Sequence, residues 1–492
     1  MQPSAVVIGS GPNGLSAAIV LARAGFSVEV REAASEPGGG TRSGELTLPG
    51  FVHDYGSAVH PMAVSSPFFA ELPLADHRLK WIWPPASLAH PLDDGTAVML
   101  ERDVATTAAQ LGEDRTAYKK LFYPLVSRWP TLAREFLRPL ARVTRHPFLV
   151  ARFGLNALLP ATVFTRIAFQ NPRTRALFAG WAAHSELMLE SPLTCAFGLI
   201  FGIAGHAAGW PIPQNGSQQI ANALIGVLKS YGGRVVTGSR VASLRELGQP
   251  DITMCDVSPH QFLQLSGHDV PRSYASCLRR YQHGPGVYKI DWALREPIPW
   301  KAKECTRSAT VHIGGSLEEI AASERAAWSN RASDRPFILL AQPTLFDSTR
   351  APGGQHTAWA YCHVPNGWKE PMLTQMENQI ERFAPGFRDC ILARAVHNPE
   401  QMHAWNENLI GGDISGGAPT LKQFILRPTW RRYRTPLRGV YFCSSSTPPG
   451  GGVHGMCGYW AAQWAISDFR KQIRPGESLP PPAQLPPKHR SF

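Results

Sequence analysis

The opening stretch of the chain constrains the fold more than any other part of the sequence. Residues 5–32 read AVVIGSGPNGLSAAIVLARAGFSVEVRE. The apolar run at 5–8 has the length of a buried parallel strand, 14–24 has helical periodicity and ends before Gly25, and 27–31 reads as a second strand. This order of strand, turn, helix and strand predicts a parallel βαβ unit.

The turn of this unit matches G-x-G-x-x-G, the pattern of a dinucleotide-binding loop. The first glycine makes the tight turn, the second lets the backbone approach a pyrophosphate, and the third lets the helix pack close to the strand. The predicted phosphate-binding residues are Gly9, Gly11, Pro12, Asn13 and Gly14. The alternative is a glycine-rich turn without a ligand.

Glu32 follows the second strand, about twenty residues past the glycines, where a carboxylate accepts hydrogen bonds from ribose hydroxyls. The same carboxylate repels a 2′-phosphate. NADP is therefore not expected at this site.

Composition sets wide limits on the rest of the chain. A chain of 492 residues, 43% hydrophobic and 17% charged, predicts a globular protein with two or more lobes. The eight cysteines include no C-x-x-C pair, so neither a zinc site nor a redox dithiol is expected, and no metal is predicted. Residues 1–4 leave no room for a secretory signal, so the sequence predicts a cytoplasmic protein.

The net charge of +12 is concentrated in one segment. Residues 134–175 hold eight arginines and the single acid Glu135, with the apolar run PFLVARFGLNALLPATVFTRIAF inside them. Basic residues beside apolar ones are typical of a helix at a membrane surface. We expect this segment to lie on the inner face of a membrane and to admit substrate; the alternatives are a solvated helical lobe and an oligomer interface.

A second glycine pair follows the first unit, in EAASEPGGGTRSGE. Gly38 and Gly39 are placed to approach a pyrophosphate, and Arg42 can neutralise it with a bidentate fork. This stretch resembles the GG-x-x-R-[ST] signature of the flavoprotein family that includes phytoene dehydrogenases, carotenoid ketolases, retinol saturase and amine oxidases. The resemblance implies that the bound dinucleotide is FAD.

The other end of the chain carries a second family motif. The stretch GVYFCSSSTPPGGGVHGMCGYW resembles the family's carboxy-terminal FAD motif, in which a strand and a loop lead to a helix whose positive end faces the flavin. The resemblance adds FAD contacts from Gly452, Val453, His454, Gly455 and Met456. It also places Val241, at the end of a strand expected at 234–241, near the adenine. Only a few residues separate that strand from the next one, where many relatives have a β-meander.

The resemblance covers nearly the whole chain and implies an α/β fold: a Rossmann-type FAD-binding lobe, a mixed-sheet substrate lobe and a helical insertion. The expected boundaries are 1–71, 210–269 and 425–473 for the FAD lobe, 72–209 for a helical lobe facing substrate or membrane, 270–424 for the substrate sheet, and 474–492 for a disordered tail. The glycine-rich GGDISGG at 411–417 lacks a preceding apolar strand, so we expect a loop there and not a second nucleotide site.

The family implies a dehydrogenase or desaturase that moves hydride between FAD and a carbon–carbon unit of an apolar, isoprenoid, carotenoid or lipid-like substrate. The alternatives are an FAD-dependent amine or amino-acid oxidase, against which the sequence offers no recognisable aromatic cage, and a non-catalytic flavoprotein. No nucleic-acid partner is expected, and the oligomeric state stays open. The catalytic candidates are His60 and His454, the two histidines that the resemblance places nearest the flavin; for each, a purely structural role is the alternative.

Overall fold

The βαβ unit predicted at the start of the chain is present and forms the centre of a parallel sheet. The structure is a computed structural model that describes residues 2–139 and 144–472. Strand β1 (Ser4–Ile8) is followed by helix α1 (Pro12–Arg23) and by β2 (Ser27–Arg31), which pairs with β1 in parallel. Three later strands complete the five-stranded order β16-β10-β1-β2-β9: β9 (Arg234–Val236), β10 (Ile252–Cys255) and β16 (Val440–Phe442).

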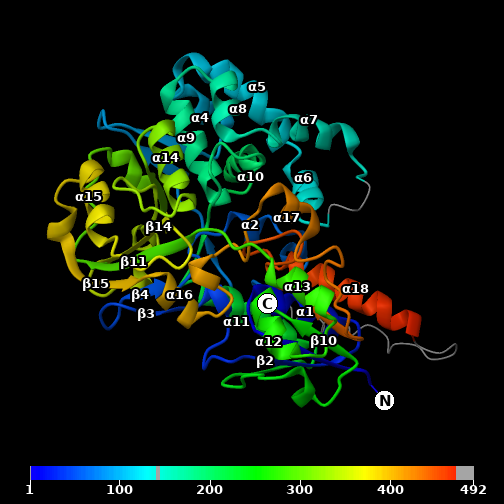
Figure 1. Cartoon of the computed structure of the whole chain (residues 1–492). Coiled ribbons are helices and arrows are strands. Elements are labelled where there is room, and N and C mark those ends of the chain that lie inside the picture. The colour runs from blue at the N-terminus through cyan, green and yellow to red at the C-terminus, as the bar shows by residue number, and fades with distance from the viewer. Residues whose placement is uncertain (1, 140–143, 473–492) are drawn as a thin grey trace, which may run out of the picture.

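Helices cover both faces of this parallel sheet (Figure 1). Ala5 and Val7 of β1 join the core under α1, α11 (Gln218–Ser230) and α18 (Met456–Gln472). Ile8, which points the other way, joins the core under α12 (Pro259–Ser266) and α13 (Arg272–Arg279). Side chains alternate between the faces of a strand, so burial on both faces explains the nearly continuous apolar run at 5–8.

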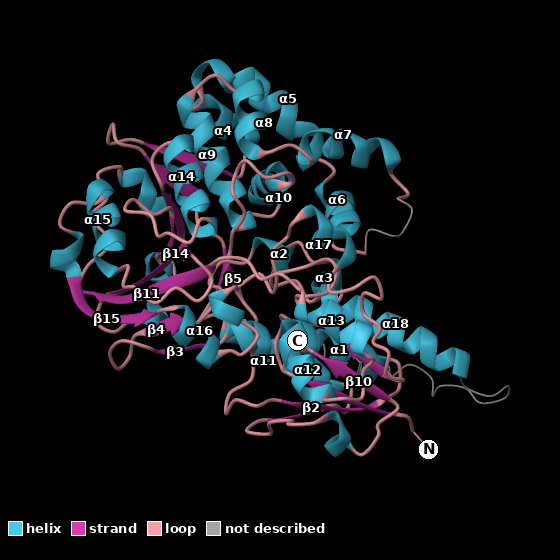
Figure 2. Cartoon of the chain, in the orientation of Figure 1, coloured by secondary structure: helices cyan, strands magenta, loops and turns pink. Residues whose placement is uncertain are grey.

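A second, seven-stranded sheet forms the other lobe, in the order β15-β11-β14-β13-β12-β6-β7 (Figure 2). Its pairs are antiparallel except β12 with β6. The strands are β6 (Ala86–Pro91), β7 (Ala97–Glu101), β11 (Gly286–Leu294), β12 (Thr310–Ile313), β13 (Ile338–Ala341), β14 (His356–Val364) and β15 (Ile391–His397). Two short ladders pair β3 (Ser43–Glu45) with β4 (Val52–Asp54) and β5 (Trp81–Ile82) with β8 (Ile212–Pro213).

A helical layer packs on one face of the mixed sheet and shares its core with α14 (Leu317–Trp328). Helix α15 (Leu373–Phe383) lies on the other face, over a separate core. The helices of the layer are α4 (Val104–Ala109), α5 (Arg115–Val126), α6 (Trp129–Phe136), α7 (Pro147–Ala157), α8 (Ala161–Ala168), α9 (Pro172–Ala182) and α10 (Thr194–Ala207). Shorter helices border the lobes: α2 (Pro61–Val64), α3 (Pro67–Ala70), α16 (Pro399–Trp405) and α17 (Leu421–Leu426).

Several local predictions need correction. The strand expected at 234–241 ends at Val236, because Gly238 has a positive φ of 61° and its amide donates to Ala34 O in the loop that follows β2. Strands β6 and β7 come from 72–209, the range expected to be a helical lobe, and join the mixed sheet. The tail predicted at 474–492 lies outside the described residues.

Candidate functional site: an FAD cleft continuous with an apolar cavity

One cavity of about 1310 Å³ runs from the carboxyl ends of the parallel strands to the mixed sheet and the helical layer. Small-molecule sites usually span about 300–1,000 Å³, so this cavity has room for a dinucleotide and a second molecule. Its walls include twelve of the residues singled out from the sequence: Gly9, Gly11, Pro12, Asn13, Glu32, Gly39, Arg42, His60, Val241, Gly452, Val453 and His454.

The two amino-terminal glycine loops meet backbone to backbone at one end of the cavity. A Cβ on Gly14 would lie 2.2 Å from Gly9 O, and one on Gly39 would lie 3.0 Å from the Cα of Gly11. Gly14 therefore packs α1 against the turn behind the cavity wall. Gly38, also behind the wall, has a positive φ of 127° and donates its amide to Ser10 Oγ. The predicted residues come together, but only some of them face the cavity.

Glu32 is held at the carboxyl end of β2 by three donors. Its Oε2 accepts from the amide and the hydroxyl of Ser10, at 2.9 and 2.6 Å, and its Oε1 accepts from the amide of Ala34 at 2.9 Å. These bonds fix the carboxylate at the cavity wall. A fixed carboxylate at this place in a dinucleotide fold suits ribose hydroxyls.

Arg42 brings a half-buried positive charge to the same end of the cavity. Its guanidinium lies 4.7 Å from the ring centroid of Trp405 and 5.6 Å from that of Tyr55, and its Nη2 donates to Trp405 O at 2.9 Å. Burial lowers the pKa of Arg42. Within 2–139 and 144–472 no carboxylate forms an ion pair with it, and its buried Nε has no hydrogen-bond partner. A half-buried cation without a carboxylate partner, beside two glycine loops, fits the pyrophosphate of a dinucleotide.

The carboxy-terminal loop closes over the same cleft. Gly450 and Gly452 have positive φ values of 121° and 126°, and the loop leads into α18. Gly455 and Met456, two of the predicted FAD contacts, lie behind the cavity wall: a Cβ on Gly455 would be 2.1 Å from Ser16 Oγ, and the amide of Met456 donates to Nδ1 of His454 at 3.0 Å. His454 thus caps the first turn of α18.

Both candidate histidines are buried, and burial lowers the pKa of each to about 4. The Nε2 of His60 lies 2.8 Å from Ser217 Oγ, and Ser66 Oγ donates to His454 O at 2.7 Å. Neutral imidazoles at neutral pH act as hydrogen-bond partners and not as cations. Both side chains reach the cavity, and both also stabilise loops.

Asp256, at the end of β10, is a cofactor-site residue that the sequence argument missed. Its Oδ2 accepts from the amide of Gly14 at 2.9 Å, and a Cβ on Gly11 would lie at the same distance from that oxygen. Burial raises the pKa of Asp256 to about 7. Asp256 thus holds the glycine turn in place through the amide of Gly14. Its position directly after strand β10 of the FAD lobe is the sequence signal that could have identified it.

The far part of the cavity is apolar and aromatic. Trp359 and Tyr361 of β14 line it and stack with ring centroids 5.7 Å apart and an interplanar angle of 16°. The sequence offered no recognisable aromatic cage. However, Trp359 and Tyr361 are two residues apart on a strand, and this spacing places both side chains on the same face of the sheet. Leu193, Phe197 and Ile200, from the start of α10, add to the wall.

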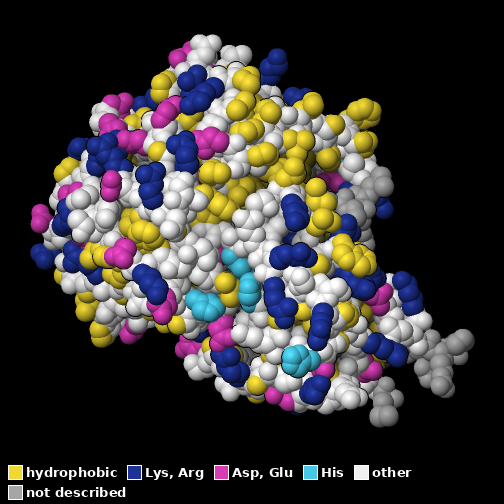
Figure 3. All heavy atoms as spheres, in the orientation of Figure 1, with side chains coloured by type: hydrophobic (Ala, Val, Ile, Leu, Met, Phe, Trp, Pro, Cys, Tyr) yellow, Lys and Arg dark blue, Asp and Glu magenta, His cyan; other side chains and the backbone are white. Residues whose placement is uncertain are grey.

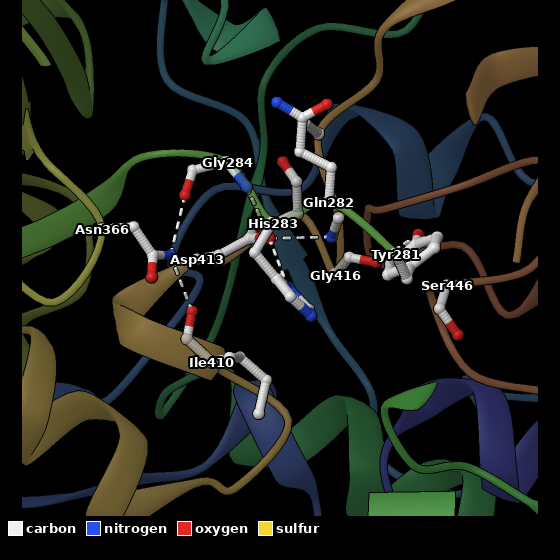
Figure 4. Close-up of polar contacts among 12 residues, drawn as sticks. Tyr281, Gln282, His283, Gly284, Asn366, Ile410, Asp413, Gly416 and Ser446 are labelled. Atoms are coloured by element: carbon white, nitrogen blue, oxygen red, sulfur yellow. Dashed lines mark hydrogen bonds and ion pairs between the residues drawn. The ribbon is translucent and has the colours of Figure 1, made fainter. Parts of the chain in front are cut away.

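The glycine-rich stretch at 411–417 is a loop, as predicted, and it borders this far part. Asp413 organises it: the Oδ2 accepts from the amides of Gly284 and Gly417 and contacts His283 Nδ1 at 2.9 Å (Figure 4). Its Oδ1 accepts from the amide of Ser415 at 2.8 Å. Asp413 thereby fixes Ser415 and Gly416 at the cavity wall.

No cluster of three or more His, Cys, Asp or Glu suited to a metal ion occurs in the described parts of the chain. The glycine cradle, the oriented Glu32 and the unpaired Arg42 all fit FAD, which would be held by these residues and the loop at 450–454 and would accept or donate hydride. The chain itself orients the cofactor and excludes water.

Comparison with known proteins agrees with this geometry. The model of an NAD(P)-binding Rossmann-like domain matches residues 7–72. Together with desaturase relatives and with amine oxidase neighbours of the same fold, this match supports an FAD-dependent oxidoreductase.

Individual relatives are distant. The chain is 26% identical to the pyridine nucleotide-disulfide oxidoreductase domain-containing protein 2 of Rattus norvegicus, over 95% of this chain and 94% of that one. It is 25% identical to a phytoene dehydrogenase of Streptomyces griseus, over 79% and 77%. The structure of putrescine oxidase bound to putrescine superposes with a TM-score of 0.60 at 16% identity, over 96% of this chain and 99% of that one. The structural likeness shows the fold alone.

Proposed function

We propose that this FAD-dependent oxidoreductase transfers hydride between the flavin and a carbon–carbon unit of a long apolar substrate of isoprenoid or lipid type. The observation that carries the proposal is the second part of the cavity, where Leu193, Phe197 and Ile200 continue the FAD cleft without a break. Long apolar molecules gain about 25 cal/mol for each Å² buried in such a wall. The phytoene dehydrogenase relative supports the same substrate class.

The cavity opens where apolar side chains gather on the surface. Leu158, Leu421 and Ile425 line the cavity and are also 59%, 48% and 48% exposed. Phe148, Leu155 and Ile167 continue the exposed patch along α7 and α8 at 90%, 78% and 77%. Figure 3 shows this apolar patch over α7, α8 and α17, with Lys and Arg side chains along its lower border.

We therefore propose that this mouth rests on an anionic membrane surface, from which an apolar substrate enters. Arg134, Arg145, Arg152 and Arg166 are exposed, and Arg166 is also paired with Glu318. Arg173 is tied to Asp94 and Ala97 O, and Arg142 lies outside the described residues. Among the described helices, none alone has the length and apolarity of a membrane span; only α7 and α8 taken together do, and they are bent by 100°. Surface docking suits such a bent amphipathic pair.

A vesicle sedimentation assay tests the membrane proposal. At low salt the protein should sediment with anionic liposomes, and Phe148→Asp together with Leu155→Asp should release it. Val236→Asp changes an exposed apolar residue on β9 and serves as the control. Failure of the wild type to bind anionic liposomes would remove this proposal.

An amine or amino-acid oxidase is the second candidate, because Trp359 and Tyr361 present a stacked aromatic pair to the cavity. The two functions separate in an anaerobic assay that follows loss of the oxidised-flavin absorption. Phytoene and other apolar isoprenoids in liposomes should reduce the flavin, whereas alkyl amines should not. Reduction by amines alone would reverse the assignment, and reduction by neither class would favour a non-catalytic flavoprotein.

A further inference from the structure

Glu186 places a buried carboxyl group in the wall of the substrate part of the cavity. The residue follows α9, is only 4% exposed, and has the left-handed backbone angles φ 55° and ψ 22°. Trp328 Nε1 donates to its carbonyl at 2.9 Å, and its amide donates to Ala183 O at 3.0 Å. A non-glycine residue in this conformation carries strain of about 1–3 kcal/mol and persists only where its surroundings fix it.

The two oxygens of this carboxyl group differ in their partners. Oε1 accepts from Ser415 Oγ at 2.6 Å. Oε2 is buried and has no hydrogen-bond partner in the part of the chain that the structure describes. Buried polar atoms are nearly always satisfied, so this unpartnered oxygen requires an explanation, and a molecule bound in the cavity beside Glu186 would supply one.

Ser415 connects this group to the carboxy-terminal FAD loop. The carbonyl oxygen of Ser415 lies 2.7 Å from the position of a Cβ on Gly451, so the serine packs directly on that loop. Glu186 is therefore one hydrogen bond away from the wall that faces the cofactor. The contacts that run from Glu186 through Ser415 to Gly451 involve neither His60 nor His454.

The groups around Glu186 keep its proton exchangeable near neutral pH. Burial raises the pKa of Glu186 to about 8, and the charge of Asp413 and then that of Glu324 on α14 act in the same direction. His363 on β14 and the hydrogen bond from Ser415 oppose the rise. Tyr361, also on β14, has its own pKa raised by burial and by the nearby Glu186. A carboxyl group of this kind is suited to general acid–base catalysis at physiological pH.

We infer that Glu186 is the proton-exchanging residue of the substrate site. In the dehydrogenation direction one carbon of the substrate loses hydride to the oxidised flavin, and the neighbouring carbon loses its proton to the Glu186 carboxylate. The electron pair of that second C–H bond becomes the new carbon–carbon double bond, so two electrons and two hydrogens leave the substrate. This inference rests on the proposed function, and in the saturating direction the same carboxyl group returns the proton.

Glu186→Gln keeps the shape and removes the exchangeable proton, and Glu190→Gln is the matched control. Glu190 lies four residues further on, is paired with Arg325 and is not among the residues that line the cavity. Both variants should purify with as much FAD as the wild type. In infrared difference spectra between pH 7 and pH 9, recorded without substrate, the carboxylic C=O band lost on raising the pH should be weaker in Glu186→Gln and unchanged in Glu190→Gln.

The kinetic arm uses anaerobic flavin reduction by phytoene in phosphatidylcholine liposomes. Glu186→Gln should slow the reduction by about 10²–10⁴-fold and flatten its pH profile, as expected when a general base is lost. Equal rates and pH profiles in Glu186→Gln and wild type would overturn the inference while leaving the proposed function intact. Absence of flavin reduction in the wild type with every apolar substrate would overturn the proposed function instead, and the inference with it.

Discussion

The crossing of α1 and α18 makes a sharp prediction, because both helices carry loops of the FAD cleft. A Cβ on Gly458 of α18 would lie 1.8 Å from Asn13 O and 2.9 Å from the amide nitrogen of Ala17. Ordinary van der Waals contact with Asn13 O begins near 3.4 Å, so Gly458→Ala forces the two backbones apart by about 1.6 Å. Neither neighbour is a flexible side chain, and the strain cannot be relieved by a rotamer change.

The expected change in the free energy of unfolding of Gly458→Ala follows from two opposing effects. Overpacking costs about 1–3 kcal/mol, and rigid backbone on the other side puts Gly458→Ala at the upper end of this range. Replacing a helical glycine by alanine returns about 1 kcal/mol of helix propensity. The net loss of about 2 kcal/mol corresponds to a fall in Tm of roughly 4–8 °C for a folding unit of 150–250 residues.

Gly154→Ala is the matched control. Gly154 is also inside a helix, α7, but a Cβ there meets nothing within 4 Å, so this variant should hold or slightly raise the Tm. Differential scanning calorimetry and the FAD content of the purified proteins give the comparison. A Gly458→Ala protein with wild-type Tm and full FAD content would refute the reasoning that the helices cross at backbone contact.

Three further predictions concern the cleft. Arg42→Met removes a charge-assisted contact of about 1.5–3 kcal/mol with the pyrophosphate. FAD affinity measured by fluorescence titration should therefore fall by about 10–150-fold, and equal FAD affinities in the variant and the wild type would refute this role. Burial raises the pKa of Asp256 to about 7, so the contribution of this group to the free energy of unfolding is largest below about pH 4 and falls as the pH rises towards 7. The Tm of Asp256→Asn should therefore rise relative to that of the wild type between about pH 4 and pH 7, and the difference in Tm should be constant above that range. A difference in Tm that does not change with pH would contradict the raised pKa. His454→Ala should keep FAD but slow flavin reduction at least about tenfold, and unchanged rates in both His454→Ala and His60→Ala would leave these histidines a structural role.

The parts of the site that could be predicted from the sequence are those in which neighbours in the chain are neighbours in space. The turn from β1 into α1 is local, and the acid at the end of β2 follows from the length of one βαβ unit. Val241 shows the limit of this reasoning. It lines the cavity, yet it lies in a loop and not in the predicted strand, because Gly238 turns the chain early.

The residues that sequence reasoning missed are brought together from distant segments. Asp256 meets Gly14 across 242 positions, and Glu186 meets Ser415 across 229. No local pattern in the sequence reports such a pairing, and a single acid is expected on the solvated surface. Trp359 and Tyr361 lie two positions apart on β14, and alternate positions of a strand share a face, so this pair could have been found from the sequence.

Protonation divides the cavity into two chemical environments, and this division explains why one cleft can hold both an anionic cofactor and an apolar substrate. Burial lowers the pKa of the cavity-lining histidines His60, His184 and His454 to about 3–4, so they are neutral at physiological pH. Two arginines lie where the dinucleotide is expected: Arg42 beside the glycine loops and Arg427, 2% exposed and held by the carbonyls of Gly416 and Ser445, beside the loop at 450–454. In the substrate part the cation is Lys289, beside the Trp359 ring, and it is paired with Asp291. The carboxyl group of Glu186, whose pKa is raised to about 8, is mostly protonated at pH 7. An ammonium substrate would find little negative charge there, whereas a hydrocarbon would need none, and this contrast favours the apolar substrate over the amine.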